Sequence, residues 1–146
     1  MTQHNAPSAQ RRVTVARLAQ IPRIEDVGAI AARFLYSLRL IAVHERARRD
    51  PVPELAARLG NVDIAAKALA LSQAIASSWP ENIQISRFCC GLLTPDEATI
   101  GAIVDAVCSH DRAAFERAVE GFVRHDRVHR LWDSALALVL AEHRCG

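Results

Sequence analysis

The chain has 146 residues, a formal net charge of +2 and a composition that is 51% hydrophobic but only 5% aromatic. This length suits one domain with its own core, and so small a net charge excludes an argument for nucleic-acid binding from charge alone. Alanine and leucine dominate while aromatic residues are few, which favours helices over strands.

The compartment is predicted from what the chain lacks. Its first twelve residues, MTQHNAPSAQRR, are polar and have no apolar core of a signal peptide. No stretch approaches the ~20 apolar residues of a membrane span, so we expect no membrane contact. Nor do the four cysteines have the spacing of a secreted disulfide framework. We therefore expect a cytoplasmic protein with reduced thiols at Cys89, Cys90, Cys108 and Cys145.

Residues 1–23 are predicted to be a flexible or loosely docked arm. They hold four arginines and no acid, and prolines stand at positions 7 and 22. The alternation of Val13 and Val15 suggests a short strand. A positive arm of this kind can bind an anionic surface, although chain termini more commonly fray or dock locally.

Residues 24–146 are predicted to form a single helical domain, whose first three helices follow one another closely. Apolar residues recur at helical spacing from Ile24 to Arg46, and prolines at 51 and 53 end that helix. A short helix then ends at Gly60, which suits a left-handed cap. The next helix, 61–77, is apolar nearly all round, which is typical of an interior helix.

The second half of the domain begins with an extended segment that leads to the cysteine pair. Thr94, Pro95 and Glu97 then have the pattern of a capping box, which predicts the next helix. Asp111 can cap another helix, and the last one starts near Asp126. The expected fold class is all-α, a compact bundle of five to six helices with at most one short two-stranded element.

The segment Ile64–Val107 resembles a family of small helical bacterial proteins. In that family an apolar helix leads to a run of cysteines and then to a Thr-x-x-Glu-Ala helix start, here Thr94, Glu97 and Ala98. This chain has two adjacent cysteines rather than three, and Gly91-Leu92 where the family pattern has a proline and a basic residue. The resemblance implies the fold and assigns no activity, and the departures weaken a metal or redox role.

The adjacent pair Cys89-Cys90 is the first candidate site. Zinc sites usually take two thiolates from a C-x-x-C spacing, and neighbouring side chains in an extended segment point to opposite sides. Packing as small hydrophobic residues is therefore the main interpretation, and thiol or metal chemistry is the alternative. Cys108 or His110 can join such a site only if the fold brings them to the pair.

His125 and His129 form a weaker metal candidate, because residues four apart share a helix face. The metalloprotease pattern requires a glutamate directly after the first histidine, and Asp126 stands there instead. Three neighbouring arginines would also repel a cation. A solvated helix face is the simpler interpretation.

The sequence disfavours two further functions, specific DNA recognition and catalysis by a known motif. Residues 52–73 resemble a helix-turn-helix in spacing, but the second helix offers only Lys67 to a groove, so we expect no specific nucleic-acid partner. The chain has no nucleophile elbow, phosphate-binding loop or dinucleotide fingerprint, so we expect no cofactor and no catalytic residue.

The leading functional hypothesis is association without catalysis, as a homodimer or with a protein partner. The wide apolar faces of 24–46 and 128–140 exceed what one small bundle needs, and excess apolar surface is often an interface. A thiol or metal site at Cys89 and Cys90 is the alternative from another class. An enzyme or ligand pocket between helices is the third.

Overall fold

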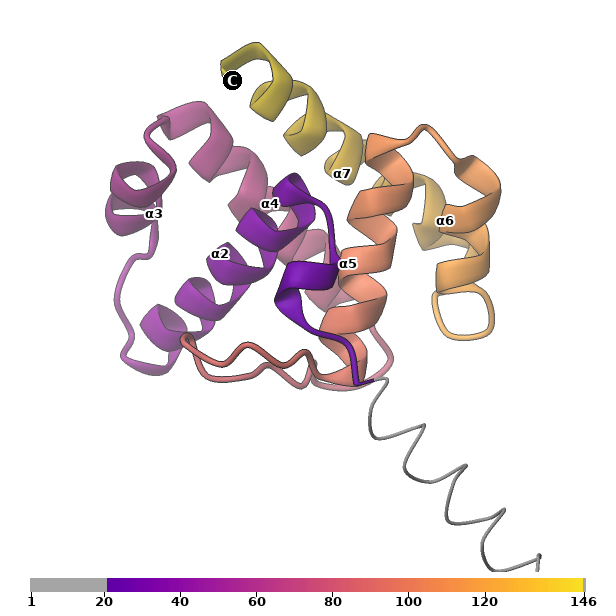
Figure 1. Ribbon diagram of the computed structural model, residues 1–146, viewed down its shortest axis with the longest axis horizontal. Helices are drawn as coiled ribbons and strands as arrows, with labels where there is room; N and C mark the ends of the chain where they lie inside the picture. Colours follow the sequence, from indigo (N-terminus) through magenta and orange to yellow (C-terminus); the bar gives the residue numbers. More distant parts are fainter. Residues whose placement is uncertain (1–20, 146) are drawn as a thin grey trace, which may run out of the picture.

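The computed structural model describes residues 21–145 and confirms the all-α prediction (Figure 1). This part of the chain contains no strand, and the expected two-stranded element is reduced to one isolated antiparallel bridge, between Arg23 and Leu92. One short 3-10 helix and six α-helices follow one another: η1 (Ile24–Asp26), α2 (Ala29–Arg46), α3 (Val52–Leu59), α4 (Val62–Ser78), α5 (Pro95–Cys108), α6 (Arg112–Val119) and α7 (His125–Cys145).

Most of the predicted arm lies outside the described residues, including the strand expected near Val13 and Val15. Its last residues run beside the segment that precedes α5. The amide of Leu93 donates to the carbonyl of Pro22, and the amide of Ile24 donates to the carbonyl of Gly91, both over 2.9 Å. The start of the described chain is therefore tied to the segment that carries the cysteine pair.

The helix ends follow the local signals in the sequence. Thr94 and Glu97 form the expected capping box at the start of α5, and Asp111 caps α6 through its side chain. Gly60 ends α3 with a left-handed backbone at φ 72°, a conformation that residues with a Cβ rarely adopt. The side chain of Asn61 then caps α4 by accepting from the amide of Ile64.

The predicted helix over 24–46 is interrupted at Val27 and Gly28. Asp26 accepts a hydrogen bond from the amide of Arg23, which closes a local turn and limits η1 to three residues. Val27 is extended and packs on Gly101 of α5, where an added Cβ would stand only 3.0 Å from a Val27 methyl. Docking against α5 therefore outweighs the helical periodicity of this segment.

Asp105 of α5 anchors the start of α2. Its carboxyl oxygen accepts from the amide of Gly28, the N-cap residue of α2, over 3.0 Å. Burial raises the pKa of Asp105, and the hydrogen bond from Gly28 offsets this only in part. The folded state therefore disfavours the charged form of the Asp105 carboxyl. The contribution of Asp105 to stability is largest below its ordinary pKa, about 3.9, and is lost as pH rises through the raised value.

We therefore expect Asp105→Asn to leave the free energy of unfolding near neutral pH unchanged or raised, because asparagine keeps the acceptor and removes the charge. Asp105→Ala should lower it by about 1 kcal/mol, as loss of a helix cap does. Urea unfolding of the two variants checks this. Equal losses in both would contradict the assignment, because they would mean that the charge itself stabilises the start of α2.

The core lies where α2, α4, α5 and α7 meet, with α6 covering the far side of α5 (Figure 1). It includes fully buried residues from each of these helices: Leu35, Leu71, Ile103, Phe115 and Leu131. A smaller cluster of Leu40, Ile41, Leu55 and Ala65 lies beneath α3. No helix in the described range 21–145 is long and apolar enough to cross a membrane.

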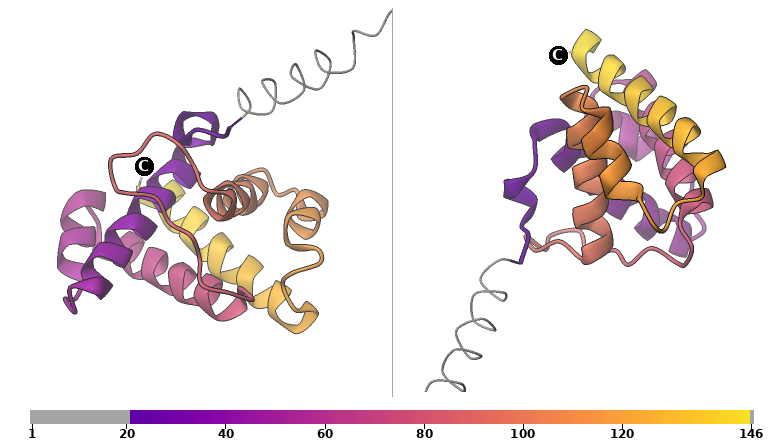
Figure 2. Two further views of the ribbon diagram at one scale, coloured as in Figure 1. Left: turned by 90° about the horizontal axis from the view of Figure 1, so that it is seen from below. Right: turned by 90° about the vertical axis from the view of Figure 1, so that its right-hand side faces the viewer.

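The predicted interior helix, α4, has one face open to solvent, which corrects the prediction. It packs against α2, α3 and α7, and it lies at the lower edge of the molecule in the left view of Figure 2. Alanine explains the difference, because helices rich in it look apolar in sequence yet tolerate solvent. The exposed residues beyond its first turn are Ala66, Ala70, Gln73, Ala76 and Ser77.

The apolar faces of 24–46 and 128–140 are used mostly by the core. In α2 only Tyr36 and Val43 remain as large exposed apolar side chains, and in α7 only Leu140 does. The surplus that the sequence suggested on these two helices is therefore small. The exposed residues of α4 beyond Lys67 are all uncharged.

Candidate functional site

A buried arginine organises the segment around the cysteine pair. Arg39 of α2 and Glu97 of α5 form an ion pair whose two side chains are fully buried, with Nε of Arg39 2.7 Å from one carboxyl oxygen of Glu97. A second hydrogen bond, 3.1 Å long, joins the other carboxyl oxygen to the Arg39 guanidinium. This bidentate pairing is the strong form of arginine–carboxylate interaction.

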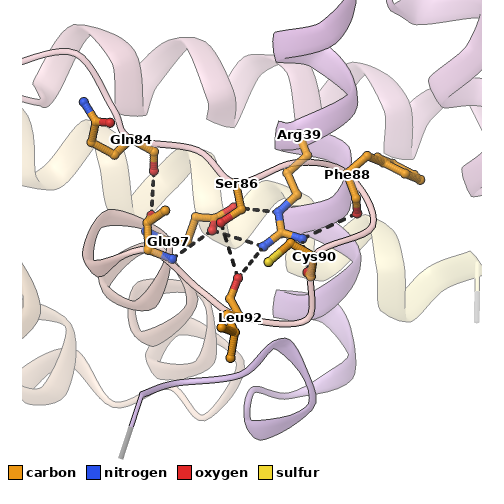
Figure 3. Close-up of polar contacts among 8 residues, drawn as sticks. Arg39, Gln84, Ser86, Phe88, Cys90, Leu92 and Glu97 are labelled. Atoms are coloured by element: carbon orange, nitrogen blue, oxygen red, sulfur yellow. Dashed lines mark hydrogen bonds and ion pairs between the residues drawn. The ribbon is translucent and has the colours of Figure 1, made fainter. Parts of the chain in front are cut away.

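The guanidinium also holds the backbone of the segment that precedes α5 (Figure 3). It donates to the carbonyl of Cys90 over 2.6 Å and to that of Leu92 over 3.1 Å, with a longer contact of 3.5 Å to the carbonyl of Phe88. One side chain of α2 thus satisfies both the carboxylate of α5 and the irregular backbone beside it, as buried polar groups require.

Glu97 is bound from its own helix as well. The amide of Thr94 donates to its carboxylate over 3.0 Å, and the Thr94 hydroxyl accepts from the amide of Glu97. Burial alone would raise the pKa of Glu97, but the hydrogen bonds from Arg39 and Thr94 and the charge of Arg39 outweigh it and lower the pKa. The hydrogen bond to Glu97 raises the pKa of Arg39 despite its burial. The pair is ionised.

The sequence contains a signal for one member of this pair. Arg39 lies among apolar residues, between Leu38 and Leu40, on a helix whose stripe continues past it on both sides. The capping-box pattern predicts only a local role for Glu97, at the start of its own helix. An arginine within an apolar stretch predicts a buried partner, but the sequence does not say which acid supplies it.

Cys89 and Cys90 lie in a turn between α4 and α5, where the amide of Cys90 donates to the carbonyl of Arg87. Cys89 is exposed and Cys90 is partly buried, and both thiols are free. The carbonyl of Cys90 accepts a hydrogen bond from Arg39, so Cys90 stabilises the fold through its backbone rather than through its sulfur atom. The expected packing role fits Cys90 better than Cys89.

Cys108 and His110 lie far from the cysteine pair. Cys108 is the last residue of α5, whereas the pair precedes its first, and a helix of 14 residues is about 21 Å long. Burial, followed by the nearby carboxylates of Asp105 and Glu142, raises the pKa of Cys108 and keeps it a thiol. His110 follows the helix with a positive φ of 53°. The structure does not bring these residues to Cys89.

His125 and His129 both lie on the first turns of α7, as expected, and both are exposed. His129 contacts the carboxylate of Asp133 one turn on, over 3.2 Å. Across residues 21–145, no group of three or more His, Cys, Asp and Glu side chains is arranged to hold a metal ion. The geometry thus gives no support to this weaker metal candidate.

Among known proteins, no family model, curated protein or solved structure matches the chain. The resemblance of 64–107 to the cysteine-run family therefore stays a prediction.

Proposed function

We propose that the protein acts through self-association, as a homodimer formed across the open face of α4. The observation that carries this proposal is the absence of charge on that face beyond Lys67, which pairs with Asp63 one turn earlier. Between Lys67 and Glu81 the chain has no charged residue, although α4 has exposed positions along its whole length. Surface helices of small domains normally carry charged side chains on the exposed side.

The geometry of the face supports a second copy of the chain as the partner. In a two-fold dimer each residue meets its symmetry-related neighbours, so an uncharged surface brings no like charges together. The small side chains of Ala66, Ala70 and Ala76 would let two α4 helices approach closely. A groove of about 600 Å³ adjoins this surface beside Gln73 and Ala76, and its other walls carry the charged residues Glu45, Arg46 and Glu81.

Catalysis has no part in the proposal. We also place the protein in a reducing compartment such as the cytoplasm, and we take the chain to be bacterial on the strength of the cysteine-run resemblance. The four free thiols support the assignment to a reducing compartment, because disulfides form readily in oxidising compartments.

Native mass spectrometry of the purified chain, without and with a chelator, tests the proposal. We expect a metal-free species of twice 16.0 kDa. The same mass should persist in the double variant Cys89→Ser/Cys90→Ser, because the proposed interface contains neither thiol. A stoichiometric metal that the chelator removes and the double variant lacks would favour the thiol alternative instead.

Ala70→Glu should convert the dimer to a monomer, because it adds a carboxylate to the proposed interface in both copies. Like charges brought together at an interface cost several kcal/mol, which weakens association at least about a hundredfold. Ala113→Glu is the matched control, an exposed alanine of α6 given the same charge, and it should stay dimeric. Sedimentation velocity measures both, and thermal unfolding checks that both fold. A monomeric wild type, or equal behaviour of the two variants, would overturn the proposal.

A further inference from the structure

An apolar pocket of about 340 Å³ lies between α2, α3 and the segment that precedes the cysteine pair. Its volume falls in the range of small-molecule sites. Phe88 forms one wall, and Figure 3 shows its side chain pointing away from the guanidinium of Arg39. Tyr36 packs on it with ring centroids 5.8 Å apart. The remaining apolar lining comes from Leu40, Leu55 and Leu59.

The charged residues of the lining are both arginines, and its other polar groups are the hydroxyls of Tyr36 and Ser37. Two arginines, Arg33 and Arg58, line the pocket, and no acidic residue does. The Arg58 guanidinium lies 5.2 Å above the ring of Phe88, so an aromatic contact holds it at the pocket wall. The pocket thus combines an apolar interior with two arginines whose side chains are half exposed to solvent.

Both arginines keep donors available for a ligand. Arg33 contacts Glu142 through Nε over 2.7 Å, and Arg58 contacts Glu54 through Nε over 3.1 Å. Their terminal NH₂ groups form no hydrogen bond within residues 21–145. A guanidinium can bind a second carboxylate through this unused edge.

Each of the two arginines pairs with one carboxylate, Arg33 with Glu142 and Arg58 with Glu54. Glu54 is shared, because Nε2 of His44 also contacts it, over 2.8 Å. Arg58 and His44 contact different oxygens of this carboxylate. Glu142 and Glu54 both lie outside the lining, so a ligand in the pocket would meet the guanidiniums rather than the carboxylates.

We propose that this pocket binds a medium-chain monocarboxylate, a fatty acid of about eight to ten carbons. The chain would occupy the space between Leu40, Leu55 and Phe88, and the carboxylate would bind the free edges of Arg33 and Arg58. At about 30 Å³ for each heavy atom, the volume one water takes in the liquid, a pocket of 340 Å³ holds about eleven heavy atoms, between the ten of an eight-carbon acid and the twelve of a ten-carbon acid. This inference is independent of the proposed dimer.

Isothermal titration with octanoate and with 1-octanol tests the proposal. The two probes share the apolar chain and differ in charge. We expect saturable binding of octanoate at least about tenfold tighter than that of 1-octanol, because charge-assisted hydrogen bonds form only with the carboxylate. Absence of saturable octanoate binding, or equal affinities for the two probes, would overturn the proposal.

Arg33→Gln and Arg58→Gln should each weaken octanoate binding at least about tenfold and leave 1-octanol binding unchanged. Arg112→Gln is the matched control. Like Arg58, Arg112 is a helical arginine that contacts a glutamate one turn away through Nε over 3.1 Å and lies over an aromatic ring, although Arg112 is partly buried. It should bind octanoate as the wild type does, and an equal loss in this variant would count against the assigned site. Thermal unfolding confirms that each variant folds.

Discussion

Replacing Arg39 with methionine is expected to lower the free energy of unfolding by about 3–5 kcal/mol, the usual cost of breaking a buried ion pair from one side. The substitution leaves the Glu97 carboxylate buried without its cation and the carbonyls of Cys90 and Leu92 without a donor. Each loss is expensive, because a buried polar group left unpaired keeps its full desolvation cost. Urea unfolding measures the effect.

The double variant Arg39→Met/Glu97→Met should recover part of this loss, because it also removes the unpaired carboxylate. It should not recover all of it, since the two carbonyls stay without a donor and α5 loses its capping box. Arg46→Met is the control, an exposed arginine of the same helix, and it should change stability by less than about 0.5 kcal/mol. Equal effects of Arg39→Met and Arg46→Met would contradict the role of Arg39.

The second large effect is the dependence of the free energy of unfolding on pH in the acidic range. Because the pKa of Glu97 is lowered in the folded state, its ionised form contributes stability that is complete above the ordinary glutamate pKa of about 4.3. That contribution is lost as pH falls through the lowered value. Glu97→Gln should therefore cost about 3 kcal/mol near neutral pH, and the difference between wild type and variant should shrink toward about pH 3.

Unfolding free energies of the wild type and of Glu97→Gln, measured by urea at several pH values between these limits, test this sign. Glu116→Gln provides a control at an exposed ion pair, where the difference should be small at every pH. A difference between wild type and Glu97→Gln that stays constant down to about pH 3 would show that ionisation of Glu97 is not what stabilises the fold.

The features that the sequence predicts well are local ones. The start of α5 follows from the spacing of Thr94 and Glu97, and the end of α3 follows from Gly60, because both depend on contacts within one turn of helix. The all-α class likewise follows from periodicity and composition. These signals depend little on how the helices later pack.

The features that the sequence does not predict are contacts between distant segments. The break at Gly28 depends on Asp105, which lies 77 residues further on, and the burial of Arg39 depends on Glu97, 58 residues away. The pocket of Arg33 and Arg58 likewise needs α2 and α3 in place. Spacing within a chain carries no information about such pairs.

Arg39 fixes the path of residues 88–92 through their backbone carbonyls rather than through the side chains that stand there. Carbonyl oxygens are common to all twenty amino acids, so the hydrogen bonds to Phe88, Cys90 and Leu92 do not depend on the side chains there. Substitutions in this segment therefore leave these hydrogen bonds to Arg39 in place. A protein built in this way can acquire or lose a surface thiol such as that of Cys89 without refolding its core.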